Sequence, residues 1–197
     1  MEEIQDYHQE KLTIDLVKAN LFAVFLMIPV FITFALPYYL LHFDESTMIH
    51  FKYFVDNIFS RFGFLGLPIF IILVTALGII AHELIHGVVW AKFAKNGFKS
   101  IKFGVLWKML TPYCHCKEPL LIKHYILGAI MPAIILGVLP AIYSIISGNF
   151  GLLLFGGFLT IAAAGDFMII YLLRKEKSND LVQDHPSEGG CFVYRKE

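Results

Sequence analysis

Residues 64–91 read FLGLPIFIILVTALGIIAHELIHGVVWA, an apolar run that carries three polar side chains near its end. A transmembrane helix needs about 20 consecutive apolar residues, so this stretch is long enough to cross a bilayer. The three polar residues are His82, Glu83 and His86. A charged side chain at the centre of a membrane costs at least about 2.5–3.5 kcal/mol on insertion scales, and such residues are by default functional. The stretch therefore predicts a membrane-spanning helix with a polar site inside it.

Three further apolar runs have the length of a membrane span. They cover residues 19–41, 125–147 and 150–173. The chain of 197 residues is 57% hydrophobic, well above the usual share in a soluble domain. We therefore predict an all-α polytopic membrane protein with four transmembrane helices. Residues 1–197 are expected to form a single integral-membrane domain, because no stretch is left for a separate soluble one.

The basic residues are concentrated on one side of the predicted membrane. Four spans place the N-terminus, the loop 92–124 and the tail 174–197 on the same side, and these segments hold 14 of the 16 Lys and Arg residues. Under the positive-inside rule both termini are predicted to be cytoplasmic, in a multi-pass protein of the plasma membrane. The acidic first 18 residues do not resemble a cleavable signal, so the first span is expected to remain as an anchor.

Charge and cysteine content narrow the possible partners. The formal net charge is zero, which argues against nucleic acid, because binding to phosphates depends on an excess of Lys and Arg. Lipid and a membrane-anchored protein or peptide are the expected partners, and no oligomeric state is predicted. Cys114, Cys116 and Cys191 would face the reducing cytoplasm, so we expect free thiols.

The polar residues of the run at 64–91 have the spacing of a zinc site. His82 and His86 are four residues apart, so on a helix their side chains lie on one face, close enough to bind one metal ion. Glu83 is rotated by about 100° from His82 and reaches the site without being a ligand. Such a set leaves an open position for water on zinc. Glu83 is the candidate general base that takes the proton of that water.

A third ligand is expected from the last span. Asp166 is the one charged residue in that span. With a rise of 1.5 Å per residue, His82 and His86 lie about 15 and 9 Å below the boundary at Lys92, and Asp166 lies about 12 Å below the boundary at Arg174. The shared depth predicts that Asp166 completes the metal site. The alternative is that Asp166 is only a counter-ion or a hydrogen-bond acceptor for one of the histidines.

The loop between the second and third spans contains a possible hairpin. Residues 95–124 begin with a turn signal and continue with the β-prone runs SIKFGVLW and TPYCHC, which predict a hairpin on the cytoplasmic face. Cys114, His115 and Cys116 carry soft ligand atoms that could hold a second metal or act in redox chemistry or as a lid. The other interpretation is a surface hairpin with ordinary thiols.

The tail is predicted to be polar with an extended end. Within it, the stretch DHPSEGG places Asp184 and His185 beside turn residues. These two side chains could fold back and support the metal ligands. A turn with a solvated histidine is the alternative.

The motifs AHELIHG, YCHCKEPL, AAAGD and DHPSEGG, in this order, resemble a small bacterial membrane family of zincin peptidases over about residues 78–194. The core also resembles the site-2 proteases, which are zinc metalloproteases of the membrane. The resemblance implies His82, His86 and Asp166 as zinc ligands and Glu83 as general base. Site-2 proteases carry an Asn and a Pro ahead of an Asp-Gly pair, whereas here Asp166 follows Gly165 and precedes Phe167, with no Asn or Pro in that run. No residue is therefore assigned to stabilise a tetrahedral intermediate.

These observations predict a zinc-dependent endopeptidase that hydrolyses a peptide bond in or near the membrane. By similarity to site-2 proteases, the region 98–116 would hold the substrate as an added strand. The alternative is a non-hydrolytic membrane protein that uses the same ligands for a structural or sensory metal. A structural zinc site prefers a fourth protein ligand, for which Cys114, His115 and His185 are the candidates.

Overall fold

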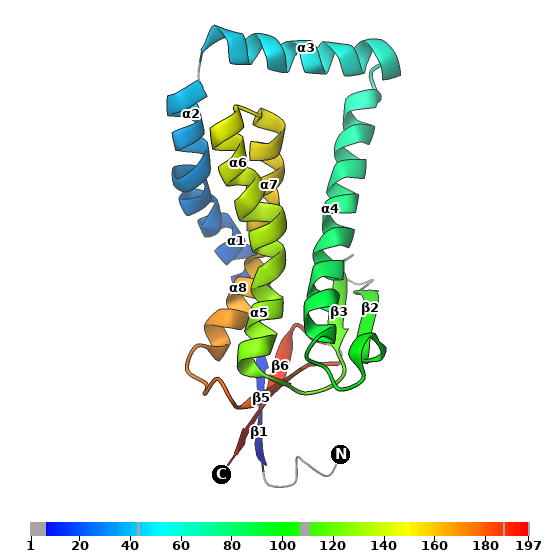
Figure 1. Ribbon diagram of the computed structural model, residues 1–197, viewed down its shortest axis with the longest axis vertical. Coiled ribbons are helices and arrows are strands. Elements are labelled where there is room, and N and C mark those ends of the chain that lie inside the picture. The colour runs from blue at the N-terminus through cyan, green and yellow to red at the C-terminus, as the bar shows by residue number, and fades with distance from the viewer. Residues whose placement is uncertain (1–6, 43, 107–110, 187, 197) are drawn as a thin grey trace.

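The computed structural model describes residues 7–42, 44–106, 111–186 and 188–196. The long helices run side by side, and the strands, including the first and the last described elements of the chain, gather at one end (Figure 1). In chain order the elements are β1 (Tyr7–Thr13), α1 (Leu16–Val30), η2 (Phe31–Ala35), α2 (Leu36–His42), α3 (Glu45–Phe62), α4 (Gly66–Ala91), η3 (Gly97–Ser100), β2 (Ile101–Leu106), β3 (Thr111–Cys116), β4 (Leu120–Leu121), α5 (Ile122–Pro132), η4 (Ala133–Val138), α6 (Leu139–Ser147), α7 (Phe150–Ala162), α8 (Ala164–Leu173), β5 (Leu181–Asp184) and β6 (Gly190–Lys196).

Three continuous helices in the described part of the chain are long and apolar enough to cross a membrane. They run over Val17–His42, Gly66–Ala91 and Ile122–Ser147. The fourth predicted span is broken, because α7 and α8 meet at an angle of 42°. By length and composition the bent pair makes a fourth candidate span. The break sets the direction of α8, the helix that carries Asp166.

Two of the long helices contain a π-helical segment that ends two residues before a proline. The segment η2 precedes Pro37, and η4 precedes Pro140. A proline has no N–H, and its ring clashes with the carbonyl group four residues earlier. A widened π turn is a common response to such a break in the helical ladder. The prolines thus explain where these two spans depart from a regular α-helix.

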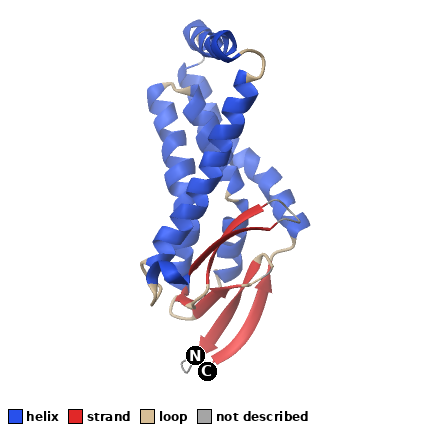
Figure 2. Ribbon diagram, turned by 90° about the vertical axis from the view of Figure 1, so that its right-hand side faces the viewer, coloured by secondary structure: helices blue, strands red, loops and turns tan. Residues whose placement is uncertain are grey.

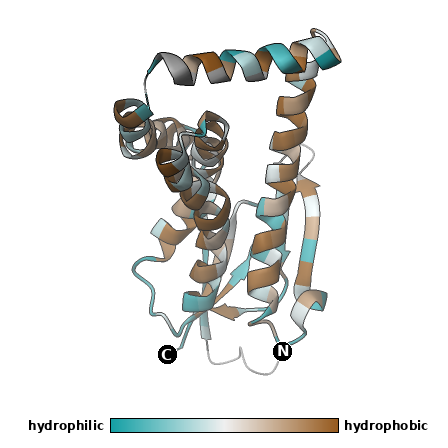
Figure 3. Ribbon diagram, turned by 45° about the horizontal axis from the view of Figure 1, so that its top comes forward, coloured by the Kyte–Doolittle hydropathy of each residue, from teal (hydrophilic) through white to brown (hydrophobic). Residues whose placement is uncertain are grey.

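The link between the first two predicted spans, residues 42–63, lacks the long apolar run of a span and was expected to be a loop, but it contains the helix α3. This helix crosses the end of the molecule opposite the strands and connects α2 to α4 (Figure 1). Its apolar residues recur every three or four positions, as in Phe51, Val55 and Ile58, which is the pattern of an amphipathic helix. Figure 3 shows the contrast in hydropathy, since α3 is mixed and α4 is mostly hydrophobic.

The prediction of an all-α protein is wrong, because the chain also forms two sheets. The predicted hairpin is present as β2 and β3, which pair antiparallel with Ile101 opposite Cys116. Its tip at residues 107–110 lies outside the described residues. A second sheet has the strand order β1-β6-β5-β4, and it lies below the helices in Figure 2. The extended end predicted for the tail is β6.

The sequence of β1 has no pattern that predicts a strand. It lies at the edge of its sheet and is mostly exposed, so it reads as a polar segment rather than as an apolar alternation. It pairs with β6, with Tyr7 opposite Lys196 at the other end of the chain. A partner so distant in sequence leaves no local pattern. The pairing places the first and last described residues side by side.

The main core lies where the helices end on the sheets. It is built from buried residues of α4, α5, α8 and both sheets, including Trp90, Ile122, Leu173 and Val182. The hairpin packs against α4 at Gly87, where an added Cβ would lie 2.6 Å from the ring of Phe103. This close approach holds β2 and β3 against the part of α4 that carries the polar residues.

Candidate metal centre

The helix α4 presents two buried imidazoles to the inside of the molecule. His82 and His86 are 7% and 4% exposed. Their ring centroids are 4.8 Å apart and the ring planes are nearly perpendicular, at 78°. Both side chains lie on the face of α4 that packs against the other helices, as the four-residue spacing predicts. Two ring nitrogens are therefore directed at one point between the helices.

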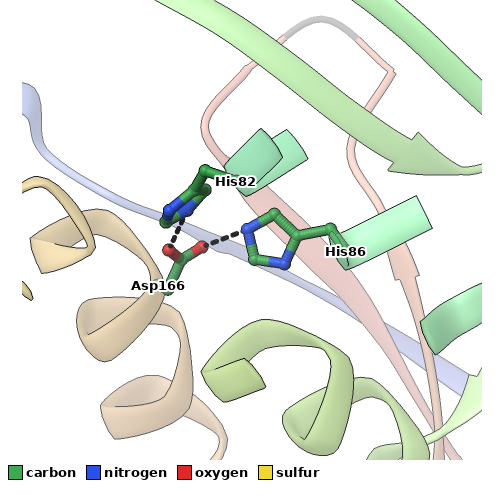
Figure 4. Close-up of side chains that lie close together, drawn as sticks. All are labelled: His82, His86 and Asp166. Carbon is green, nitrogen blue, oxygen red and sulfur yellow. Dashed lines mark hydrogen bonds and ion pairs between the residues drawn. The ribbon is translucent and has the colours of Figure 1, made fainter. Parts of the chain in front are cut away.

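Asp166 reaches the same point from α8. The bend after α7 starts a new helix at Ala164, and Asp166 lies in the first turn of that helix. A carboxylate in this position is stabilised by the positive end of the helix dipole. Figure 4 shows the Asp166 carboxylate between the two imidazoles, with one oxygen toward each ring. The structure thus brings together the three side chains for which the sequence predicted a meeting.

The ligand atoms lie close enough together for one metal ion to bind all three side chains. His82 Nε2 lies 3.0 Å from Asp166 Oδ2, and His86 Nε2 lies 3.3 Å from Asp166 Oδ1. The three ligand atoms all lie within 4.8 Å of one another. Bonds of about 2.0–2.2 Å to zinc place two ligands of a tetrahedron about 3.4 Å apart. Two nitrogens and a carboxylate oxygen are also a donor set that zinc accepts.

The second ring nitrogen of His86 has a partner of its own. His86 Nδ1 lies 2.9 Å from the carbonyl oxygen of Gly128 in α5. A carbonyl oxygen only accepts, so Nδ1 carries the proton in this contact and Nε2 keeps its lone pair in the neutral ring. Nε2 is the nitrogen that faces Asp166. The contact with Gly128 therefore selects the tautomer that can bind a metal.

Glu83 lies next to this ligand set without belonging to it. It is half-buried, and its carboxylate takes a hydrogen bond from the backbone of Cys114 in β3. Among the residues that the structure describes, the group able to share one cation contains His82, His86 and Asp166 alone. Glu83 thus lies beside the three candidate ligands.

Residues 75–181 match a protein family described as "putative zincin peptidase". The chain belongs to this family. Searches of curated proteins and of solved structures gave no match. The family description names a zinc metallopeptidase, and the matched segment contains the two histidines, Glu83 and Asp166. It ends before the stretch at 184–190 that was part of the predicted resemblance.

The other candidate ligands lie apart from this centre. Cys114, Cys116 and Cys191 are free and buried, as the prediction of free thiols required. Burial raises the pKa of Cys116 to about 11 and that of Cys191 to about 12, and it also raises the pKa of Cys114. A thiol that stays protonated is a poor nucleophile and a poor metal ligand. All three cysteines belong to the buried core where the helices meet the sheets.

The histidines of the hairpin and the tail are also kept out of the centre. Burial lowers the pKa of His115 to about 4, with further contributions from Lys102 and His185. His185 is buried rather than solvated. Its ring Nδ1 accepts a hydrogen bond from the backbone N–H of Glu188, and the backbone N–H of His185 donates to the carbonyl of Gly190. The stretch connects β5 to β6 as a turn, as predicted, but the prediction that His185 is solvated was wrong.

Asp184 makes more hydrogen bonds than its place in a polar turn indicated. Its two carboxylate oxygens accept hydrogen bonds from the hydroxyl of Tyr125, at 2.5 Å, and from the backbone N–H of Cys116, at 2.7 Å. Burial raises the pKa of Asp184 to about 6. Sequence reasoning singled out Asp184 but missed Tyr125 and Trp90, which look like ordinary aromatic residues near helix ends.

Proposed function

We propose that the protein is a zinc-dependent, membrane-embedded endopeptidase. The observation that carries this proposal is the convergence of His82, His86 and Asp166 on one point, with Glu83 beside them. Three protein ligands leave a fourth position of a tetrahedral ion open for water or substrate, as in catalytic zinc sites. Membership of a zincin peptidase family supports the same chemistry.

Zinc, when bound, would supply Lewis acidity to water and to the substrate carbonyl. The remaining chemistry belongs to the chain. Glu83 accepts the proton of the attacking water at its carboxylate and delivers that proton to the leaving amine. His86 is held in the required tautomer by the Gly128 carbonyl. Gly87 lets the hairpin approach α4, so that the backbone of Cys114 can orient the Glu83 carboxylate.

The arrangement of the chain ends supports four crossings of the membrane. Because β1 pairs with β6, the two ends lie on the same side of any membrane, which requires an even number of crossings. Three helices are candidate spans, and the bent pair α7–α8 makes an even number. The excess of Lys and Arg on the side of the strands supports cytoplasmic termini in a bacterial plasma membrane. The substrate is then a membrane-anchored protein or peptide.

The hairpin is well placed to hold such a substrate as an added strand. The N–H of Cys114 that meets Glu83 points away from β2, so the outer edge of β3 faces the metal ligands. An extended segment that pairs with a strand edge is bound through its backbone, whatever its side chains are. The outward N–H groups of Cys114 and Cys116 already donate to Glu83 and Asp184, so a substrate segment would pair with the carbonyl groups of this edge, which would bring a peptide bond to Glu83.

The alternative of a structural or sensory metal lacks the feature it requires. A structural zinc site is closed by a fourth protein ligand. In the described chain, Cys114, His115 and His185 all lie outside the group that could share an ion. An open position therefore favours the hydrolytic function.

The proposal is tested with purified protein reconstituted in liposomes with a library of single-span reporter proteins. Glu83→Gln should keep its zinc and lose at least about 100-fold in cleavage rate, the lower end of the contribution of a general base. Glu188→Gln, a surface carboxylate paired with Lys11, is the matched control and should cleave normally. Undiminished cleavage by Glu83→Gln would overturn its role. If the purified wild-type protein does not bind zinc at the three candidate ligands, the proposal as a whole is overturned.

A further inference from the structure

A continuous chain of side chains runs from the metal ligand His86 to the four-stranded sheet. His86 stacks on the indole of Trp90, with centroids 5.0 Å apart and planes inclined by 13°. Trp90 in turn stacks on the ring of Tyr125, again at 5.0 Å and at 14°. The hydroxyl of Tyr125 donates to Asp184 at the end of β5. None of these contacts is required by the proposed hydrolysis itself.

Hydrogen bonds fix each aromatic ring within the stack. Trp90 Nε1 donates to the carbonyl of Tyr125 at 3.0 Å. Trp90 and Tyr125 are 4% and 3% exposed, so the two rings have little room for other orientations. Gly128 is also fitted to the indole, because an added Cβ there would collide with Trp90. The same residue supplies the carbonyl for His86 Nδ1. The indole and the imidazole are therefore positioned by one turn of α5.

Asp184 ties this stack to the hairpin. While one carboxylate oxygen takes the Tyr125 hydroxyl, the other takes the backbone N–H of Cys116. Cys116 is two residues from Cys114, whose backbone meets Glu83. The Asp184 carboxylate is thus connected to the metal centre in two ways. One runs through the aromatic rings to His86, and the other runs along β3 to Glu83.

We propose that Asp184, with Tyr125 and Trp90, is a positioning residue for the metal centre. Resting on the proposed function, this inference assigns to the C-terminal sheet the task of holding the His86 ring and β3 in the arrangement that binds zinc. Partners of metal-ligating histidines set ring orientation, and their loss costs about 10- to 100-fold in metal affinity or activity. The same range is expected here, since the stack and the Gly128 contact restrain one ring together.

The test measures cobalt affinity and the cobalt absorption spectrum of the purified full-length protein in detergent, alongside its melting temperature. Two variants remove the link in different ways. Asp184→Asn keeps the shape but leaves one of two donors without an acceptor, and Tyr125→Phe keeps the stacked ring and removes the hydroxyl alone. Glu176→Gln is the matched control. It weakens a carboxylate pair with Arg195 on the same sheet, away from the stack.

Both link variants should bind cobalt about 10-fold or more weakly and shift its visible spectrum, while Glu176→Gln changes neither. Variants that melt earlier but bind cobalt with wild-type affinity and an unchanged spectrum would reduce Asp184 to a structural residue and overturn the inference. Failure of the wild-type protein to bind cobalt would overturn the proposed metal centre together with the inference. The two failures are thereby distinguished.

Discussion

Both halves of α4 are rich in apolar residues, but their surroundings differ. Every residue from 67 to 77 is exposed or half-buried, whereas the second half supplies the buried positions Gly78, His82, His86, Gly87, Trp90 and Ala91. Lipid tails are as apolar as leucine, so composition does not separate a lipid-facing stretch from a packed one. The polar residues make the difference visible. They begin one turn after Gly78, where α4 meets α7.

The largest difference between the halves should appear in metal binding. His86→Ala removes a ligand from the packed half, and the affinity for zinc should fall by more than about 100-fold, because even residues behind a ligand cost about 10- to 100-fold. Leu84→Ala, two residues away and facing outward at 47% exposure, should leave the affinity unchanged. Competition with a chromophoric chelator measures both. Equal affinities in the two variants would mean that the imidazole of His86 is not a ligand.

Substitutions in the two halves of α4 should also differ in their effect on the stability of the protein. Gly87→Ala places a methyl group against Phe103 and Ile101 of the hairpin, and overpacking of this kind costs about 1–3 kcal/mol. Ala76→Leu adds more volume in the exposed half and should change stability by less than about 0.5 kcal/mol. Unfolding in mixed micelles gives both values. A tolerated Gly87→Ala would show that the hairpin is free to move away from α4.

Asp184, which is linked to the packed half of α4 through Tyr125 and Trp90, should make the stability of the protein depend on pH. The pKa of Asp184 is raised from 3.8 to about 6 by burial, opposed by its hydrogen bonds from Tyr125 and Cys116 and by His86, and aided by Asp166. An acid whose pKa is higher in the folded state stabilises that state fully below its unfolded pKa and loses this contribution as pH rises through its folded pKa. The metal-free protein should therefore lose about 1–2 kcal/mol between pH 4 and 7 through this group.

Asp184→Asn isolates that contribution, because an amide does not titrate. The difference in melting temperature between the variant and the wild type should shift in favour of the variant as pH rises over this window. A difference that stays constant with pH would mean that Asp184 is ionised in the folded state throughout. Both proteins are stripped of metal before the measurement, so that protonation of the ligands affects them equally.

The sequence was informative wherever a signal is local. The spacing of His82 and His86 and the depth of Asp166 follow from helix geometry, and the hairpin follows from its turn and its β-prone runs. The helix α3 was missed because its mixed composition resembles a loop in a chain dominated by apolar runs. The strand β1 was missed because its partner lies at the other end of the chain. The bend before Asp166 was missed because apolar content alone does not show where a span breaks.

The exposed half of α4 should tolerate truncation of its largest side chains. Leu73 is 56% exposed, so Leu73→Ala removes contacts with lipid rather than with protein, and the change should stay below about 0.5 kcal/mol. Leu173→Ala, at 1% exposure, is the comparison and should cost about 2–5 kcal/mol. Unfolding of both variants in the same bilayer-like micelles gives the contrast. A large cost at Leu73 would mean that this surface packs against protein when the molecule is in a membrane, and a crosslink from Leu73→Cys would then show whether the contact is a second copy of the chain.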